Sequence, residues 1–213
     1  VVPFRVKYAL TDAARRRSLP YRLLGPGSVA IQVGLLATPY GRGGRAQWRS
    51  RGGRSPTAGF SSWSRTRPAP TSSVRRAAER RGLAHVRVVR AAAWFERTTL
   101  TMQVDPGHPA SNFVAGATDY AHDELARFRS IRVEAVPLDD LVDDADLGRV
   151  TLVSVTTNGA EQEILRGLLR TLERDRPYVC LARTAASHAE FMGGLGYDLL
   201  GDDDRGYTFQ YGG

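Results

Sequence analysis

Residues Val150 to Gly167 carry the strongest structural signal in the chain and read Val-Thr-Leu-Val-Ser-Val-Thr-Thr-Asn-Gly-Ala-Glu-Gln-Glu-Ile-Leu-Arg-Gly. The stretch opens with a β-rich apolar run, and the polar turn that follows closes on Gly159. Beyond the turn, apolar side chains recur at the spacing of one helix face, at Ile164, Leu165, Leu168, Leu169 and Leu172. The pattern predicts a strand, a tight turn and an amphipathic helix. In open α/β sheets ligands bind at the carboxyl ends of the strands, so Thr156, Thr157 and Asn158 are candidate site residues.

Strand and helix signals alternate along the rest of the chain. Strands are predicted at residues 29–33, 86–89, 98–104, 131–136 and 178–182. Helices are predicted at residues 74–81, 138–145 and 186–194, and a loop is predicted at residues 105–117. Residues 197–200 and 207–211 flank an acidic turn, which predicts a terminal hairpin. The alternation predicts an α/β fold with a doubly wound, mostly parallel sheet and an antiparallel C-terminal edge hairpin.

Length and composition narrow the class of protein. At 213 residues, 42% of them hydrophobic, the chain can bury a core, and a single domain over residues 1–213 is expected. No uninterrupted apolar segment approaches the roughly 18 residues that span a bilayer, and residues 1–17 lack a basic segment followed by an apolar one. We therefore expect a soluble, cytoplasmic protein without membrane contacts. The single cysteine, Cys180, lies in an apolar run and is expected to be buried.

The net charge of +8 comes from one segment. Between Gly41 and Arg76 the chain has no acidic residue and nine arginines: Arg42, Arg45, Arg49, Arg51, Arg54, Arg65, Arg67, Arg75 and Arg76. Removing these nine from the 30 basic residues leaves 21, against 22 acidic residues. The rest of the chain is essentially neutral, which argues against nucleic acid as the general partner of this protein.

Residues 41–73 are irregular in the place where the second strand of the sheet is expected. They are rich in Arg, Gly, Ser and Pro and show neither helical nor strand periodicity, which is typical of a disordered basic arm that binds phosphate. A second interpretation is a frame-shifted translation. In a gene rich in G and C, residues 59–68 can be encoded so that a shifted frame reads Val-Leu-Val-Val-Glu-Pro-Asp-Pro-Ala. That product is an apolar strand ending in an acid, as used to hold a ribose hydroxyl.

A series of short motifs lies in a fixed order along the second half of the chain. The motifs are Val136-Pro137-Leu138-Asp139-Asp140-Leu141, Val150-Thr151-Leu152-Val153, Asn158-Gly159-Ala160-Glu161, Glu163-Ile164-Leu165-Arg166-Gly167 and Arg176-Pro177. Their order and spacing resemble the FkbM-type methyltransferases over residues 74–197, with residues 29–34 as a separate match. The resemblance implies a Rossmann-like enzyme that uses S-adenosylmethionine to methylate hydroxyl groups of small molecules or sugars.

The resemblance also implies which residues contact the cofactor. Gln32 and Gly34 lie at the end of the first strand, where glycine lets a cofactor approach the backbone, and Thr156, Asn158 and Gly159 form the opposing wall. A second interpretation treats Gln32 and Asn158 as ordinary strand-end and turn residues. Asparagine before glycine tolerates a left-handed conformation, which alone would explain Asn158.

The chain departs from the family pattern at this wall. The family usually has Lys-x-Asp-x-Glu-Gly, whereas this chain has Ser154, Thr156 and Asn158 before Gly159, so both carboxylates are gone. If a divergent branch of the family carries a Thr-Thr-Asn-Gly turn at this position, these residues are normal for that branch. The alternatives to an active methyltransferase are a catalytically inactive protein of the same fold and a basic nucleic-acid-binding module.

Histidine is the usual general base near neutral pH, and loops commonly carry function. His108 and His122 fall in or beside a predicted loop and are therefore the weak catalytic candidates. No histidine has metal-ligand spacing to another ligand residue, so no metal site is expected. Five aspartates are expected to lie on a solvated helix face and its flanks: Asp139, Asp140, Asp143, Asp144 and Asp146.

Overall fold

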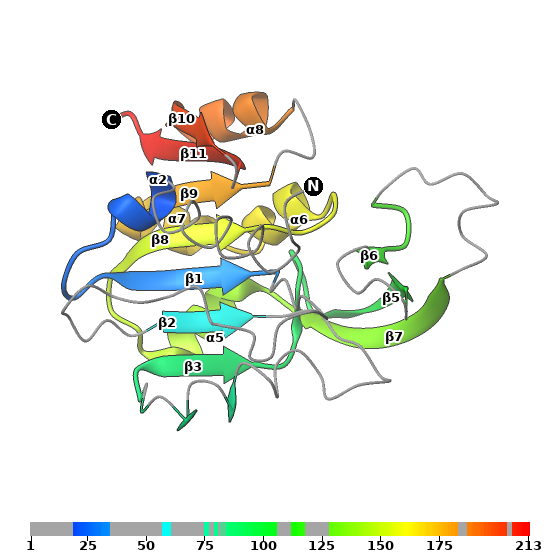
Figure 1. Ribbon diagram of the computed structural model, residues 1–213. Coiled ribbons are helices and arrows are strands. Elements are labelled where there is room, and N and C mark those ends of the chain that lie inside the picture. Colours follow the sequence, from blue (N-terminus) through cyan, green and yellow to red (C-terminus); the bar gives the residue numbers. More distant parts are fainter. Residues whose placement is uncertain are drawn as a thin grey trace, which may run out of the picture.

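The structure is a computed structural model with a mixed α/β fold (Figure 1). It describes residues 19–34, 57–60, 75–76, 79–80, 82, 84–105, 112–117, 128–182, 187–203 and 206–213. The predicted helix at residues 74–81 is helical at residues 75–76 and 79–80, which are the described part of it. Among the described helices, none is long and apolar enough to cross a membrane.

The larger sheet has seven strands in the order β10-β11-β9-β8-β1-β2-β3. The strands are β1 (Val29–Val33), β2 (Thr57–Phe60), β3 (Val86–Val89), β8 (Val150–Val155), β9 (Tyr178–Leu181), β10 (Tyr197–Asp203) and β11 (Gly206–Tyr211). The neighbours from β9 to β3 pair in parallel, whereas β11 pairs antiparallel with both β9 and β10. The predicted parallel sheet and its antiparallel edge hairpin are therefore confirmed.

Strand β2 lies in the segment that was expected to be irregular. Its backbone pairs in parallel with β1 on one side and β3 on the other, from Ala30–Thr57 to Phe60–Val89. The prediction that residues 41–73 are irregular throughout is wrong at the four residues of β2. A chain that lies between two strands forms backbone hydrogen bonds with both of them, even where its own β-propensity is weak. The remainder of that segment lies outside the described residues.

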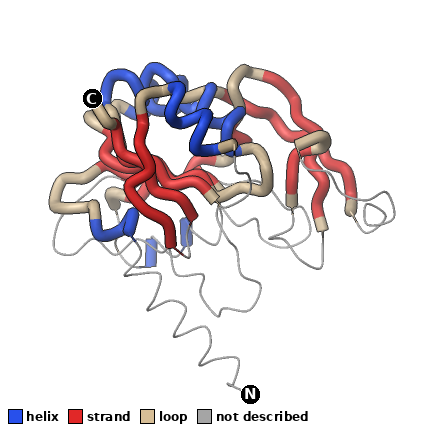
Figure 2. The backbone as a smooth tube through the Cα atoms, turned by 90° about the horizontal axis from the view of Figure 1, so that it is seen from above, coloured by secondary structure: helices blue, strands red, loops and turns tan. Residues whose placement is uncertain are grey.

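Within the described part of the chain, four helices cover one face of this sheet: α5 (Leu138–Ala145), α6 (Glu161–Arg166), α7 (Leu169–Asp175) and α8 (His188–Gly194). Figure 2 shows these helices on one side of the strands and the short α2 (Leu19–Arg22) on the other. The helices and the sheet share a core that includes Ile31, Val33, Val153, Val155, Val179, Leu181, Phe209, Ile164, Leu165, Leu168, Leu172 and Met192. This apolar layer holds β1 and β8 in place, and with them the carboxyl ends of these two strands.

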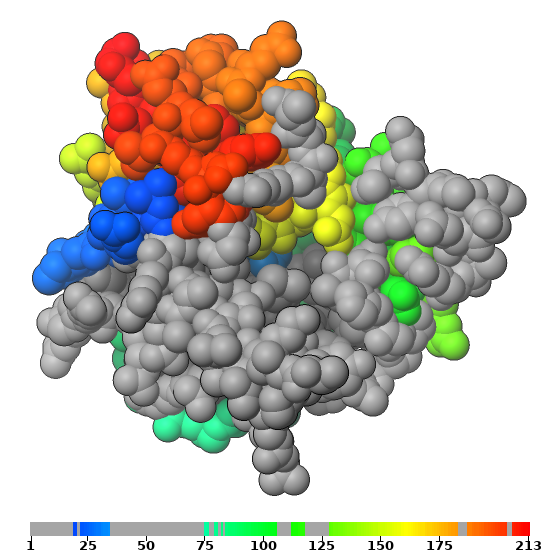
Figure 3. Space-filling model, turned by 45° about the horizontal axis from the view of Figure 1, so that its top comes forward, coloured from blue at the N-terminus to red at the C-terminus, as the bar shows by residue number. Residues whose placement is uncertain are grey.

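On the opposite face, α2 packs against the C-terminal hairpin. The Leu19 N–H donates to Asp203 Oδ2 at 2.6 Å. Figure 3 shows the blue start of the described chain directly beside the red-orange hairpin. Cys180 of β9 is buried, as expected.

The helix predicted after Gly159 is two helices, α6 and α7, that break at Gly167. A Cβ at Gly167 would clash with the carbonyl oxygen of Trp94, so the chain approaches that backbone closely. The carbonyl of Gly167 accepts from the N–H of Asp139 at 2.9 Å. Leu169, the first residue of α7 after this break, is 43% exposed, so its predicted place on the buried face is wrong.

Asp139 explains how α7 begins. Its carboxylate accepts hydrogen bonds from Arg170 N (2.9 Å), Thr171 N (3.0 Å) and Thr171 Oγ1 (2.7 Å). The side chain thus satisfies amide groups that a new helix leaves without intrahelical partners. The prediction of a solvated side chain is wrong for Asp139, which is 5% exposed, whereas Asp143, Asp144 and Asp146 are exposed.

A smaller sheet of four strands lies beside the first, in the order β4-β7-β5-β6. It consists of β4 (Ala92–Ala93), β5 (Thr98–Val104), β6 (Phe113–Val114) and β7 (Arg129–Val136). The predicted strands at 98–104 and 131–136 are confirmed, but they pair antiparallel with each other and not with the large sheet. The predicted loop at 105–117 is wrong at β6, which pairs with β5. In Figure 1 this sheet lies on the side to which the arrowheads of β1, β2 and β3 point.

Candidate functional site

Strands β1 and β8 are neighbours in the sheet although they are far apart in the sequence. From β1 the chain builds outward through β2 and β3, and it then returns to the other side of β1 with β8. Their carboxyl ends are joined by a hydrogen bond from Thr156 N to Val33 O at 3.0 Å. In open α/β sheets this reversal of strand order is the point where ligands bind. The structure therefore brings the predicted residues Gln32, Gly34 and Thr156 together at such a point.

Gln32 is held firmly at the end of β1. Its amide nitrogen donates to Val33 O (2.9 Å) and to Thr156 Oγ1 (3.1 Å), with a longer contact to Gly34 O (3.4 Å). The side chain is 3% exposed, and its Oε1 has no hydrogen-bond partner among the described residues. A buried amide oxygen normally accepts a hydrogen bond, so Gln32 presents an acceptor of fixed orientation at the strand end.

Gly34 has a left-handed backbone, with φ of +78°. A Cβ at this position would overlap the backbone carbonyl of Thr156, and the Thr156 hydroxyl donates to Gly34 O at 3.0 Å. The chain's own packing of β1 against β8 therefore already requires glycine here. The role of Gly34 toward a cofactor stays a prediction.

The turn after β8 is held by its own backbone conformation and by a contact from the smaller sheet. Gly159 adopts the left-handed conformation, with φ of +88°. Asn158 does not, so a tolerance for that conformation fails to explain its presence. Its amide nitrogen instead donates to Asn112 O, next to β6, at 2.8 Å. This bond connects the smaller sheet to the turn.

Sequence reasoning missed two buried polar residues behind this turn, Glu161 and His188. The Thr157 N–H and hydroxyl both donate to Glu161 Oε1, at 3.0 and 2.9 Å. The second oxygen, Oε2, lies 4.0 Å from His188 Nε2. Burial lowers the pKa of His188, although the Glu161 carboxylate and a hydrogen bond with the Ala182 backbone oppose this shift. No short-range pattern could have paired them, because they begin different helices.

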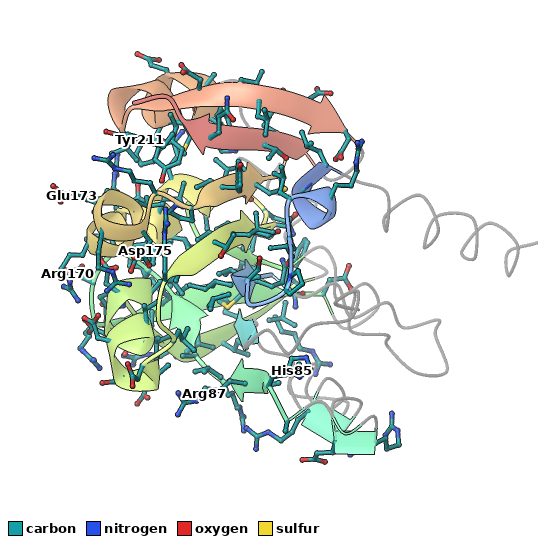
Figure 4. The ribbon with its side chains drawn as sticks, turned by 90° about the vertical axis from the view of Figure 1, so that its left-hand side faces the viewer. His85, Arg87, Arg170, Glu173, Asp175 and Tyr211 are labelled. Carbon is teal, nitrogen blue, oxygen red and sulfur yellow. The ribbon has the colours of Figure 1, made fainter. Side chains whose placement is uncertain are left out.

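The other histidines do not join this site within the described part of the chain. His108 and His122 both lie outside the described residues, so their catalytic role stays a prediction. His85 precedes β3 and therefore lies at the amino end of the parallel strands, opposite the site. Figure 4 shows His85 near the β3 edge of the sheet, at which Arg87 of β3 also lies.

The acidic residues of α5 form ion pairs with arginines. Arg170 of α7 lies 2.7 Å from Asp143, and Arg97 lies 2.8 Å from Asp140. Figure 4 shows Arg170 and Asp175 on the helical side of the sheet, away from β3. Among the described residues, no three His, Cys, Asp or Glu side chains are grouped so that they could hold a metal ion.

Comparison with known proteins places the chain in a family. The FkbM methyltransferase domain matches residues 84–208, which is more than half of the chain. The chain belongs to the FkbM methyltransferase family. The match contains β8 and its turn, whereas β1 with Gln32 lies before it.

The chain is similar to a solved structure, the methyltransferase FkbM from Methylobacillus flagellatus KT. It is 12% identical to this FkbM-family chain, with a TM-score of 0.46, and the likeness covers 74% of this chain and 36% of that one. The chain thus spans about a third of the length of that solved relative. None of the curated proteins compared with it matches.

Proposed function

We propose that this protein is an S-adenosylmethionine-dependent methyltransferase with a Rossmann-like sheet, and that it methylates a hydroxyl group of a small molecule or sugar. Family membership supports the methyltransferase activity. The observation that carries the proposal is the buried Gln32 Oε1, an acceptor without a partner among the described residues, beside the paired ends of β1 and β8. That position is the expected ligand-binding point of an open α/β sheet.

The residues at this point fit the proposed cofactor chemically. S-adenosylmethionine carries an ammonium group and ribose hydroxyls, all of which donate hydrogen bonds, and Gln32 Oε1 accepts one. Gly34 and Gly159 lack side chains beside the strand ends, and Asn158 contributes an amide at the turn. These four residues, with Thr156, would hold the cofactor.

The chain's own contribution to the reaction is alignment and exclusion of water. When bound, S-adenosylmethionine supplies a methyl group on a positively charged sulfur. Its transfer is an in-line displacement, for which a protein mainly orients the reactants and keeps water out. The contacts from Gln32 to Val33 and Thr156 fix one wall, and the Asn158–Asn112 bond fixes the other. An acid–base group at residues 156 and 158 is therefore not required.

Isothermal titration of the full chain with S-adenosylmethionine tests the proposal. Saturable binding is expected, and Gln32→Leu should weaken it about tenfold or more because the buried acceptor is lost. Gln103→Leu is the matched control, since Gln103 lies on β5 and bonds Ser130 on the small sheet.

Absence of saturable binding by the folded wild-type protein would overturn the proposal. Binding to nucleic acid that weakens steeply with salt would then support the basic binding module. A folded protein that binds neither would support the inactive alternative, which the missing carboxylates at Thr156 and Asn158 favour.

A further inference from the structure

Glu161 and His188 form a buried pair behind the turn at the end of β8. Glu161 is the first residue of α6 and His188 the first residue of α8, so the pair joins two helices. Their exposed fractions are 0% and 2%. The two side chains face each other across 4.0 Å.

The carboxylate of Glu161 is tied to the turn by two hydrogen bonds. Both come from Thr157, through its backbone N–H and its hydroxyl, and both end on Oε1. A carboxylate taken out of water is unfavourable unless donors surround it. Burial of Glu161 therefore favours the one turn conformation in which Thr157 supplies its donors.

His188 approaches the same carboxylate from the other side. Glu161 is the charged group that faces its imidazole from α6, and from the end of β9 the contact is the backbone of Ala182. Glu190, on α8 itself, is exposed. The imidazole thus links the end of β9 to the residue that holds the turn after β8.

We propose that Glu161 and His188 are positioning residues that fix the turn of residues 156–159 through Thr157 and set the charge that a ligand meets there. The inference rests on the proposed function for the identity of that ligand. With His188 neutral, the pair carries the single negative charge of Glu161. With His188 protonated, the charges cancel, and the turn loses its attraction for a cation such as a sulfonium.

Amide hydrogen exchange at Thr157 tests the positioning role without any ligand. Glu161→Ala removes the acceptor and should speed exchange of this amide about tenfold or more. Glu161→Gln keeps an acceptor oxygen and should stay close to wild type, which is rescue by the conservative variant. Glu163→Gln is the matched control, because Glu163 lies on the same helix but pairs with Arg166.

Thr157→Val provides a second variant should Glu161→Ala fail to fold. It removes the hydroxyl donor while keeping the N–H, and exchange of the backbone amide at position 157 should rise several-fold. Unchanged exchange in both Thr157→Val and a folded Glu161→Ala would overturn the positioning role. If Glu161→Ala does not fold, unchanged exchange in Thr157→Val alone would overturn it.

The pH dependence of S-adenosylmethionine affinity tests the charge. Because burial places the pKa of His188 below its ordinary 6.5, wild-type affinity should be constant above that pH and fall several-fold as the pH is lowered below it. His188→Asn should bind with an affinity that is flat over the same range. His85→Asn is the matched control, since His85 lies at the opposite end of the strands, and should behave like wild type.

The two experiments separate failure of this inference from failure of the proposed function. A wild-type protein that binds no S-adenosylmethionine contradicts the function, and the exchange measurement still decides whether Glu161 holds the turn. If the wild type and His188→Asn both bind with the same pH profile, the proposed function stands and the charge role of the pair is contradicted.

Discussion

The two faces of the large sheet carry different side chains at neighbouring positions. Toward the helices, register partners such as Val33, Val155 and Leu181 are apolar and buried. On the opposite face one row crosses four strands and consists of Gln32, Ser154, Cys180 and Thr208. All four residues of the row are also buried. The two faces are thus equally buried, but one presents apolar side chains and the other presents this row of polar side chains and a cysteine.

Three polar atoms of this row have no hydrogen-bond partner among the described residues: Gln32 Oε1, Ser154 Oγ and Thr208 Oγ1. Buried polar groups without partners cost stability, whereas buried methylene groups add to it. The helix-covered face therefore supplies stability, whereas the polar row lowers it. Gln32, which is predicted to contact the ligand, belongs to this polar row.

The largest expected effect comes from the apolar face. Leu165→Ala removes a fully buried side chain from the core between α6 and the sheet and should lower the free energy of unfolding by about 2–5 kcal/mol. Urea denaturation followed by circular dichroism measures the loss. Leu199→Ala is the control, because Leu199 is 53% exposed and should change stability by under about 0.5 kcal/mol. Equal losses in both variants would show that the helix-covered face does not supply the stability assigned to it.

Asp139→Ala should have the next largest effect, because it affects the helices that cover the apolar face. It removes the acceptor for three donors at the start of α7 and should cost about 2 kcal/mol. Thermal unfolding measures this change against Asp144→Ala, whose side chain is exposed. A melting temperature equal to that of Asp144→Ala would show that α7 begins without this cap.

Ser154→Ala tests the polar row with a smaller expected effect. The hydroxyl has no partner among the described residues, so its removal should leave stability unchanged or raise it by up to about 1 kcal/mol. Val153→Ala, one residue away on the helix-covered face, should be clearly destabilising. Urea midpoints of the two variants compare the faces directly. A loss above about 1.5 kcal/mol in Ser154→Ala would mean that its hydroxyl is paired in solution.

The smallest effect expected is on the pH dependence of stability. The folded-state pKa of His188 lies below 6.5 because of burial, so between these values the unfolded chain binds more protons. The free energy of unfolding should therefore decrease as the pH falls below 6.5, and His188→Asn should lack this part of the decrease. Denaturant midpoints from pH 7.5 to 5 measure it. Parallel curves for the two proteins would show that the histidine titrates normally.

The elements with continuous apolar runs could be predicted from sequence. Strands β1, β8 and β9 are buried on both faces, so their residues show the pattern without help from distant contacts. The convergence of Gln32, Gly34 and Thr156 also followed, because the carboxyl ends of parallel strands meet at one edge.

Features that depend on distant partners could not be predicted. Strand β2 has a weak local pattern and forms because β1 and β3 flank it. The break before α7 depends on Asp139 and on the Trp94 backbone. Both are distant in the sequence, so the spacing of apolar residues around Gly167 does not reveal them. A frame-shifted origin for part of residues 41–73 stays a prediction, and reading the gene's DNA tests it.

The bond between Asn158 and Asn112 has a mechanical consequence. Asn112 also accepts from the N–H of Asp105, at the end of β5, through its side-chain oxygen at 3.0 Å. The end of β5 is thus connected to the turn after β8 through two successive hydrogen bonds. A displacement of the smaller sheet would therefore be transmitted through these two bonds to the turn at the carboxyl end of β8.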